Sequence, residues 1–490
     1  MLKYILLLLA LPPILLLPLS LSLFLLLLSL TFLGFYLRLR CISRRINSPT
    51  VAFFHPYCNA GGGGERVLWQ CVLSVLENFP TATVYIYTGD VDAPPHQIID
   101  NAESCFGLKL PAQNVRFIYL KTRFLVEAKC YPIFTLLGQS IGSMVLGLEA
   151  LCKLQPAYYV DSMGYAFTYL LADLIGCDVI SYVHYPTIST DMLGKVAARE
   201  ETYNNTSTVA RNPLLSSVKL IYYKIFARLY SAMGAKSKLV FVNSSWTKGH
   251  IDELWQVPDR TTLLFPPCNT EKFLQISGPR SRRVVSVAQF RPEKDHKLQV
   301  ESFAKFVEKS GRRDVRLTLV GGVRNQADRD RVTSLLELTR SLGVEELVEF
   351  KVSIPYPELY QILSDSLVGL HTMWNEHFGI GVVEFMAAGI VPIAHNSGGP
   401  KLDIVVPGAG FLASTVEQYS DHMTRVLEMG EEELENMRRR GRDHVKGTFS
   451  DETFRKVFME KCVGVLDMDL QWIVEEEEKE EEEEEEADCN

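Results

Sequence analysis

Short apolar segments alternate with stretches of helical periodicity along most of this 490-residue chain. The segments that we expect to form strands cover residues 51–54, 83–88, 115–120, 157–161, 179–184 and 239–243 in the first half, and 284–288, 315–320, 347–350, 367–370 and 390–394 in the second. Alternation of this kind is typical of parallel sheets that helices cover on both faces. The sequence therefore predicts an α/β protein built from two doubly wound domains that face a cleft.

The ends of the chain differ in composition from this α/β body. Residues 1–46 are an apolar segment with a basic flank, and residues 471–490 form an acidic tail that we expect to be disordered. Between them we expect a first domain over residues 47–265, a linker rich in turn formers over 266–283, and a second domain over 284–470. The tail supplies much of the net charge of −9, so the body is nearly neutral and shows no signature of nucleic-acid binding.

The apolar amino-terminal segment predicts a membrane anchor. Residues 4–37 carry no charge, and about 20 apolar residues suffice to span a bilayer. A cleaved signal peptide is the alternative, but the apolar run is long and no small-residue cleavage site ends it. Four arginines follow the run and a single lysine precedes it: Arg38, Arg40, Arg44 and Arg45, against Lys3. The positive-inside rule then predicts a single-pass protein whose body is cytosolic.

A glycine loop follows the first expected strand. Gly61, Gly62, Gly63 and Gly64 precede a helical stretch, so backbone amides and a helix amino terminus could approach a phosphate or a sugar. The dinucleotide fingerprint fails because its third glycine would fall at Arg66, and the GK[ST] of a phosphate-binding P-loop is absent. A purely structural turn remains the alternative. His184, at the end of another expected strand, is an equally open choice between a structural and a functional histidine.

Two carboxylates in the second half could bind a polyhydroxylated ligand. Glu376 lies in an expected strand-to-helix loop and Glu384 lies about two turns into the helix, with Gly379 and Gly381 at the turn. This edge of an open α/β sheet is where ligands bind, and the helix amino terminus would face a phosphate. On spacing alone, two solvated surface acids are as good an interpretation.

Positive charge and further glycines are expected at the same edge. Arg291 and Lys294 lie in one strand-to-helix loop and could stabilise a leaving diphosphate. Gly321 ends the next expected strand, and the run Asn396 to Lys401 is another glycine loop at a strand end. A diphosphate-linked ligand could therefore lie between the two sheets.

At this point the motifs resemble a known family. The glycine loop, the run AQFRPEK, the two glutamates with seven residues between them, and SGGP together resemble the retaining, nucleotide-sugar-dependent glycosyltransferases with two Rossmann-like domains (GT-B). More narrowly, HPYCNAGGGGERV, RPEKDH and NEHFGIGVVEFMAAG resemble the α-1,2-mannosyltransferases of asparagine-linked glycosylation, which add the fourth and fifth mannoses. The resemblance covers roughly residues 50 to 460.

The resemblance implies a substrate pair and a place in the cell. It implies GDP-mannose as donor, a dolichyl-diphosphate-linked trimannosyl-chitobiose as acceptor, retention of the anomeric configuration, and no cofactor or metal. It places the body at the cytosolic face of the endoplasmic reticulum membrane, with other mannosyltransferases of the pathway as further partners. The residues that it brings to the reaction are Glu376 at the donor sugar, Glu384 at the ribose, Phe378, Gly379 and Ile380 at the diphosphate, Gly62 to Gly64 and Gly321 around the donor, and His184, Lys294 and Arg291 at the reaction centre.

One departure leaves the charge of the leaving group open. The superfamily often has an arginine where this chain has Gln289, so Arg291 or Lys294 must supply the positive charge. A front-face reaction, in which the leaving phosphate takes the acceptor proton, is our hypothesis. The alternatives are a GT-B transferase for another donor or lipid-linked acceptor, such as an earlier mannosyl step, and a catalytically inactive membrane scaffold. An oxidoreductase is the weakest alternative because of Arg66.

Two apolar inserts and two residue types complete the expectations. Residues 133–148 are uncharged, and residues 214–233 mix basic and aromatic side chains in a way that suggests the lipid headgroup layer, with buried core helices as the alternative for both. The ten cysteines lack metal-ligand spacing and are expected to be free thiols. The sequons at Asn204, Asn205 and Asn243 are expected to be unused in the cytosol.

Overall fold

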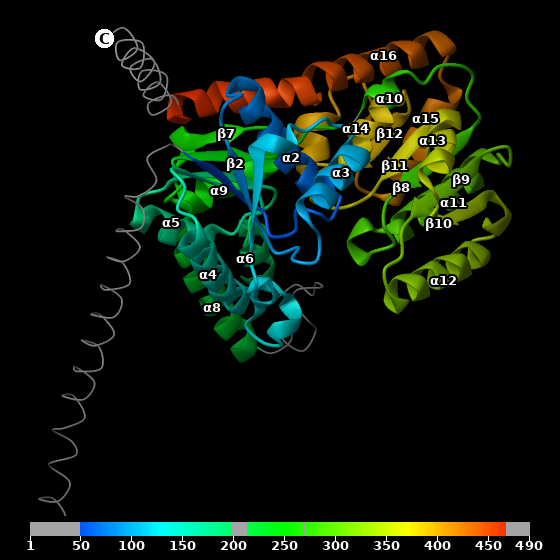
Figure 1. Ribbon diagram of the computed structural model, residues 1–490. Coiled ribbons are helices and arrows are strands. Elements are labelled where there is room, and N and C mark those ends of the chain that lie inside the picture. Colours follow the sequence, from blue (N-terminus) through cyan, green and yellow to red (C-terminus); the bar gives the residue numbers. More distant parts are fainter. Residues whose placement is uncertain (1–49, 198–212, 269, 467–490) are drawn as a thin grey trace, which may run out of the picture.

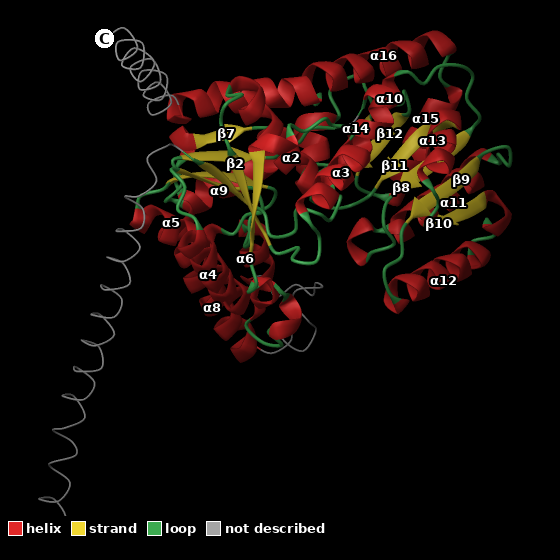
Figure 2. Ribbon diagram, viewed as in Figure 1, coloured by secondary structure: helices red, strands yellow, loops and turns green. Residues whose placement is uncertain are grey.

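The computed structural model describes residues 50–197, 213–268 and 270–466 (Figure 1). The expected anchor at residues 1–46, the acidic tail at 471–490, and the sequons at Asn204 and Asn205 lie outside the described residues. Within them, two parallel sheets lie in two halves of the molecule, each covered by helices (Figure 2). The predicted α/β class with two doubly wound domains is therefore confirmed.

The first half contains a seven-stranded sheet in the order β3-β2-β1-β4-β5-β6-β7, with every pair of strands parallel. Its strands are β1 (Val51–Phe54), β2 (Val84–Thr88), β3 (Val115–Tyr119), β4 (Tyr158–Asp161), β5 (Asp178–Val183), β6 (Leu239–Val242) and β7 (Thr261–Leu263). Its helices are α2 (Gly63–Asn78), α3 (Pro95–Phe106), α4 (Thr135–Lys153), α5 (Tyr169–Ile175), α6 (Thr190–Ala197), α8 (Pro213–Gly234) and α9 (Ser245–Trp255). The strand order changes direction between β1 and β4, a point at which open α/β sheets bind ligands.

The second half repeats this plan with six parallel strands in the order β10-β9-β8-β11-β12-β13. Its strands are β8 (Arg283–Val287), β9 (Arg316–Gly321), β10 (Val348–Val352), β11 (Ser366–His371), β12 (Val391–His395) and β13 (Phe411–Ala413). Its helices are α10 (Glu271–Leu274), α11 (His296–Ser310), α12 (Gln326–Ser341), α13 (Tyr356–Asp365), α14 (Ile380–Ala387), α15 (Val416–Glu428) and α16 (Glu431–Thr448). Strand order here changes direction between β8 and β11.

The last helical segment among the described residues, 451–466, returns to the first half (Figure 1). Phe454 and Phe458 are buried in the core that lies between the first sheet and α2, and Arg66 of α2 binds Asp451 at 2.5 Å. The predicted boundary of the second domain at residue 470 differs from this packing, because nothing in the pattern of the segment indicates which core it joins. The chain thus crosses between the two halves twice, near Cys268 and near Phe449. A backbone hydrogen bond joins these crossings, because the N–H of Cys268 donates to the carbonyl of Phe449 at 3.0 Å.

The two apolar inserts fold as surface helices with one buried face each. In α4, Gly142 and Gly147 lie so close to Leu125 and Thr168 that a Cβ at either glycine would collide with them. The exposed side of α4 carries apolar residues instead, and the helix is long and apolar enough to cross a membrane by length and composition alone. In α8 the aromatic side chains Tyr223, Phe226 and Tyr230 are buried in the core, as the alternative interpretation expected, and the opposite face is apolar as well.

Candidate functional site

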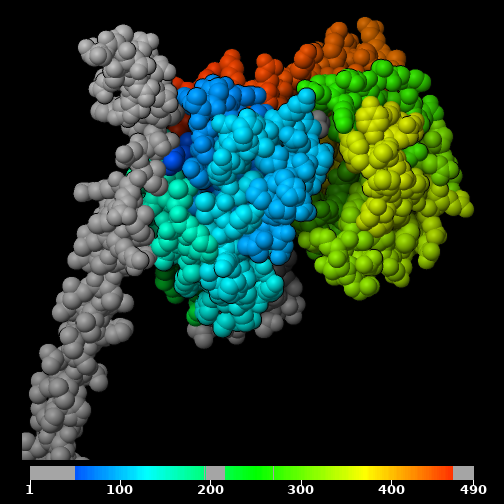
Figure 3. Space-filling model, viewed as in Figure 1, coloured from blue at the N-terminus to red at the C-terminus, as the bar shows by residue number. Residues whose placement is uncertain are grey.

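A cavity of about 310 Å³ lies where the two halves face each other. In the space-filling view a notch separates the blue and cyan first half from the green and yellow second half (Figure 3). The cavity is lined by loops at the carboxyl ends of β5, β6, β8 and β11 and by the amino terminus of α14. The lining residues are Gly63, Gly64, His184, Tyr185, Asn243, Pro266, Val287, Ala288, Lys294, His371, Glu376, His377, Phe378, Gly379, Ile380 and Gly381.

Glu376 is the centre of the polar contacts in this cavity. Its Oε2 forms an ion pair with Nζ of Lys294 and lies 3.3 Å from Nε2 of His371, the last residue of β11. Burial acts to raise the pKa of Glu376, but the hydrogen bond from His371 and the charge of Lys294 hold the pKa well below its usual range. The side chain is therefore an anion that is fixed in place, and the arrangement suits hydroxyl recognition better than proton transfer.

The loop that carries Glu376 is braced by the glycine loop that follows β12. The N–H of Gly399 donates to the carbonyl of Glu376 at 2.9 Å, and the N–H of Asn375 donates to Oγ of Ser397 at 2.8 Å. A Cβ at Gly398 would collide with the backbone of Glu376, and one at Gly399 with the backbone of Phe378. The SGGP motif is thus a structural support, which is why it needs two consecutive glycines.

The amino terminus of α14 points its amides at the cavity. Gly379 precedes the helix with φ of 114°, a backbone conformation that favours glycine. Among the described residues no backbone acceptor binds the N–H groups of Ile380 and Gly381, and both residues line the cavity. The side chain of Phe378 instead packs in the core, so only its backbone is available at the cavity. Free amides at a helix start are a binding site for an anionic group such as a diphosphate.

Glu384 lies one turn into α14, and among the described residues no side chain forms a hydrogen bond or ion pair with its carboxylate. Burial raises the pKa of this carboxyl to about 7, and no nearby cation offsets the effect. A half-buried acid without a partner is costly in the free protein. It is a suitable acceptor for the hydroxyl groups of a ligand, which would satisfy its oxygens.

The wall contributed by the first half consists of the glycine loop and His184. Gly63 approaches Ile380 so closely that a Cβ would lie 3.2 Å from its Cδ1, and Gly64 packs in the same way on the ring of His184. Burial lowers the pKa of His184 to about 4, so the ring is neutral at neutral pH. Its Nε2 lies 3.0 Å from the carbonyl of Ser162, which can only accept, so Nε2 carries the proton and Nδ1 is left as an acceptor.

Gly62 positions the loop and does not line the cavity. It precedes α2, and its N–H donates to Oε2 of Glu65 at 2.6 Å. The other oxygen of Glu65 lies 3.5 Å from Nε2 of the fully buried His55, whose Nδ1 lies 2.8 Å from Oγ of Ser162. The glycine loop is therefore connected to His184 through hydrogen bonds of Glu65, His55 and Ser162.

Besides Gly62 and Glu384, two more predicted residues do not line the cavity. Arg291 does not line the cavity, and its guanidinium lies 3.9 Å from Glu293 in its own loop. Gly321 ends β9, where a Cβ would collide with the carbonyl of Ala288, so it permits close packing of two strand ends and does not line the cavity. Of the two cations considered from the sequence, only Lys294 faces the cavity.

The structure adds residues that sequence reasoning missed. His371 follows directly on one expected strand and Asn243 is the last residue of another, which was the available signal, and Tyr185 and His377 are the neighbours of His184 and Glu376. Asn243 is also the remaining sequon, and it is buried with Oδ1 bound to Oγ1 of Thr247 at 2.7 Å. A buried cleft residue of this kind cannot present its side chain for glycosylation in the folded protein.

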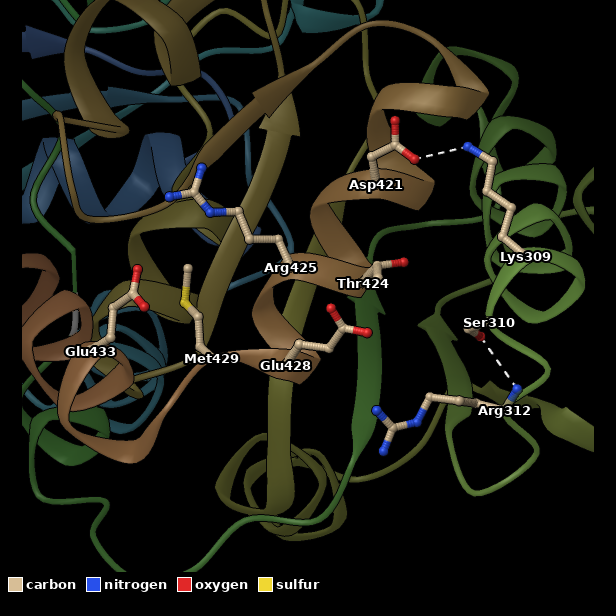
Figure 4. A pocket seen from close by; sticks show the side chains of 9 residues that line it. All are labelled: Lys309, Ser310, Arg312, Asp421, Thr424, Arg425, Glu428, Met429 and Glu433. Carbon is tan, nitrogen blue, oxygen red and sulfur yellow. Dashed lines mark hydrogen bonds and ion pairs between the residues drawn. The ribbon is translucent and has the colours of Figure 1, made fainter.

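A second, larger hollow of about 920 Å³ lies on the outer side of the second half (Figure 4). It is an open groove between the end of α11 and the α15–α16 corner, and several of its charged residues have partners. Lys309 binds Asp421 at 2.8 Å, and Arg425 lies over the ring of Phe411. None of the residues that the sequence singled out lines this groove, so the interdomain cavity is the candidate site.

Two family models match the chain. The model described as ALG11 mannosyltransferase N-terminus matches residues 48–255, and the model described as Glycosyl transferases group 1 matches residues 270–444. The interval between the two matches, residues 256–269, overlaps the beginning of the expected linker. Each of them covers one sheet and one wall of the cavity.

Similar curated proteins share the name GDP-Man:Man(3)GlcNAc(2)-PP-Dol alpha-1,2-mannosyltransferase. The protein from Xenopus laevis is 51% identical over 422 residues, which cover 84% of this chain and 86% of that protein. The human protein is 50% identical over 426 residues, with coverage of 84% and 86%. The protein from Dictyostelium discoideum is 44% identical over 440 residues, with coverage of 87% and 86%.

Solved structures with the same fold are more distant in sequence. Sucrose-phosphate synthase from Thermosynechococcus elongatus aligns with a TM-score of 0.62 at 16% identity, covering 86% of this chain and 100% of that chain. Anabaena Alr3699/HepE in complex with UDP and glucose aligns with a TM-score of 0.57 at 14% identity, covering 84% and 98%. At such identities the likeness establishes the fold alone.

Proposed function

The chain belongs to the family of GDP-Man:Man(3)GlcNAc(2)-PP-Dol alpha-1,2-mannosyltransferases, and on that premise we propose how its cavity performs the transfer. The protein transfers mannose from GDP-mannose in α-1,2 linkage to dolichyl-diphosphate-linked trimannosyl-chitobiose, for protein N-glycosylation. The observation that carries the proposal is the group formed by Glu376, Lys294 and His371 beside the free amides of α14. This group offers an anion for sugar hydroxyls next to positive charge for a diphosphate.

We propose that the donor lies along α14. The mannose contacts Glu376, the diphosphate lies between Lys294 and the amides of Ile380 and Gly381, and the ribose hydroxyls donate to Glu384. This order follows the chemistry of the wall, because the cation and the amides are the groups suited to phosphate, and the carboxylates are suited to hydroxyls. In this arrangement Arg291 does not contact the donor.

The reaction breaks the bond between C1 of mannose and the β-phosphate oxygen and forms a bond from C1 to O2 of the acceptor mannose. Negative charge develops on the leaving diphosphate, where Lys294 and the α14 amides stabilise it. We propose a front-face route, in which the acceptor hydroxyl passes its proton to the leaving phosphate oxygen and the anomeric configuration is retained. The neutral His184 and the fixed anion Glu376 then orient hydroxyls and form no covalent intermediate.

We propose further that the transfer needs no metal, since Lys294 and the amides supply positive charge to the diphosphate. Mannose transfer by protein treated with EDTA should equal that of untreated protein. A loss of activity that added Mg²⁺ or Mn²⁺ restores would contradict this part of the proposal.

The test of the function is direct transfer. The full chain in vesicles is incubated with GDP-mannose and the lipid-linked trimannosyl acceptor, and the product is digested with an α-1,2-mannosidase. We expect products one and two mannoses longer, both sensitive to the enzyme, corresponding to the fourth and fifth mannoses. No transfer, transfer from UDP-sugars in place of GDP-mannose, or resistance to digestion would overturn the assignment, and an inactive scaffold would give the first of these results.

We propose that the body works at the cytosolic face of the endoplasmic reticulum membrane, attached by a single span within residues 1–46. The dolichol-linked acceptor that the relatives are named for requires a site close to lipid. Two helices of the first half support such a position. Phe134, just before α4, packs on Tyr222 of α8, and the exposed residues of the two helices are mostly aliphatic.

The apolar residues of this surface are exposed by roughly half or more in most cases. We call them the α4/α8 face, and they are Ile133, Phe134, Ile141, Val145, Val218, Ile221, Ile225 and Leu229. Lys224 and Arg228 lie on the same helix α8, where they can meet lipid phosphates. An apolar surface flanked by cations suits the headgroup layer of a bilayer. We propose that this face rests on the membrane that holds the acceptor.

A further inference from the structure

Tyr185 is the exposed aromatic residue of the cavity wall. It follows His184 directly after β5, lines the cavity, and is 58% exposed. Its ring stacks on that of His377, with centroids 5.1 Å apart and an interplanar angle of 17°. His377 also meets Trp246 of α9, with ring centroids 5.0 Å apart and an interplanar angle of 31°. Three rings from both halves thus form one stack, which we call the Tyr185 stack.

The backing rings fix the orientation of an otherwise mobile surface side chain. An isolated tyrosine at this exposure would sample several rotamers, and ordering it on a ligand would cost entropy. Here the stack has already ordered the ring, so a ligand that binds it meets a flat, preorganised surface. A side-chain hydrogen bond also joins the two halves, because Nδ2 of Asn375 donates to Oδ2 of Asp191 at 2.7 Å.

Tyr185 stacks on His377 of the second half, yet it is 58% exposed and can still meet the second substrate. Lys294, Glu376 and α14 belong to the second half, whereas Tyr185 projects from the first half beside His184. The face of an aromatic ring carries partial negative charge, which complements the partially positive C–H groups on the flat side of a pyranose. Asp191 lies 3.6 Å from Nε2 of His250, whose ring contacts Trp246, so its carboxylate can accept hydrogen bonds from sugar hydroxyls beside the stack.

We propose that the Tyr185 ring is the binding platform for a mannosyl unit of the acceptor oligosaccharide. The proposal rests on the proposed function, because it names the residue by which that cavity binds its second substrate. A stacked pyranose there would lie beside the reaction centre, with its hydroxyls directed at the donor. If Tyr185 only held the two halves together, its substitution would weaken the binding of the donor and of the acceptor alike.

Three variants of the full chain test the platform. In Tyr185→Ala we expect the KM for the lipid-linked acceptor to rise about ten-fold or more, while the Kd for GDP-mannose, measured by calorimetry, changes less than about two-fold. Tyr185→Phe keeps the ring and should retain the wild-type acceptor KM. Trp246→Ala removes a ring that supports the stack but leaves Tyr185 in place. It is the matched control for a purely structural role of the stack, and we expect a smaller rise in acceptor KM.

The soluble oligosaccharide without its lipid separates sugar binding from membrane contact. As a competitive inhibitor it should show the same rise in Ki in Tyr185→Ala as the lipid-linked acceptor shows in KM. An unchanged Ki would overturn the platform, and so would equal weakening of GDP-mannose binding in Tyr185→Ala and Trp246→Ala. If Tyr185→Ala unfolds at a lower temperature than the wild type, the acceptor KM of Tyr185→Leu is compared with that of Tyr185→Phe. Leucine keeps most of the side-chain volume but removes the aromatic ring. Absence of mannose transfer by the wild-type chain would instead contradict the proposed function.

Discussion

At the scale of single residues, Glu384 makes donor binding depend on pH. Burial raises the pKa of its carboxyl to about 7 in the free protein. Ribose hydroxyls donate to the ionised form, so a bound donor lowers this pKa and binding releases a proton. GDP-mannose affinity should therefore rise with pH up to about 7, by at most about ten-fold per pH unit, and level off above it.

Calorimetry from pH 5.5 to 8.5 checks this dependence. In Glu384→Gln the group cannot ionise, so the slope between pH 6 and 7 should disappear. Glu376 cannot produce the same slope, since its pKa lies far below this range. A slope that persists in Glu384→Gln would show that another group titrates on donor binding.

Lys294 and Arg291 give a matched pair of cations from one loop. Removing the positive group that faces the leaving diphosphate should lower kcat by about 10²- to 10³-fold in Lys294→Met. Arg291→Met should remain within about three-fold of the wild type, because its guanidinium lies by Glu293, outside the cavity. Single-turnover mannose transfer measures both, with thermal unfolding as the control for folding. Equal losses in the two variants would mean that Arg291 reaches the diphosphate.

The sequence predicts which residues lie at the strand ends that form the candidate site. It does not predict which way their side chains point. Glu376, His184 and Lys294 were found because each follows an apolar strand, and parallel strands bring such ends together. Arg291 follows the same strand as Lys294, yet a short turn at Pro292–Lys294 separates their directions. Gly321 looked like a ligand contact because a glycine at a strand end has the same pattern whether a ligand or a carbonyl approaches it. The predicted roles of these residues in catalysis stay predictions.

At the scale of elements, the loop after β12 holds the loop after β11. Gly399→Ala would place a Cβ against the backbone of Phe378, which cannot move without displacing the start of α14. Such overpacking costs about 1–3 kcal/mol, and we expect the KM for GDP-mannose to rise about ten-fold. Steady-state kinetics at saturating acceptor measures this rise.

Gly249→Ala in α9 is the matched control for this substitution. A Cβ there meets nothing within 4 Å, so the change should leave the KM unaltered. It should also stabilise the fold by about 0.5–1 kcal/mol, because alanine is the better helix former. Unchanged donor kinetics in Gly399→Ala would show that the two loops are not mechanically coupled.

Most elements could be predicted because long apolar strands alternate with amphipathic helices. The strands at two sheet edges, β7 and β13, were missed, since each has three residues and too few positions to show a period. The segment 451–466 was placed with the wrong neighbours for a different reason. Its apolar face would fit either core, and only the tertiary contacts of Phe454 and Phe458 with the first half decide between them.

At the scale of the whole molecule, the α4/α8 face relates the cavity to the bilayer. A buried aliphatic side chain contributes about 1.5–3 kcal/mol, so the double variant Ile221→Asp, Ile225→Asp should weaken membrane seating strongly. We expect transfer to acceptor in vesicles to fall at least about ten-fold. Transfer to the same acceptor in detergent micelles should change little. Equal losses in both assays would indicate damage to the fold rather than to membrane contact.

The two crossings between the halves meet at one place, and this determines how the cleft can move. The chain leaves the first half near Phe265 and returns past Phe449, whose rings lie 5.1 Å apart and both pack on Phe378. Because both connections lie on the same side, the two halves can separate widely at the opposite side of the cleft. The loop at Phe378, which faces the diphosphate and packs on both connections, hardly shifts. Opening for exchange of the glycan therefore need not disturb the nucleotide end, so the two substrates can come and go by separate movements.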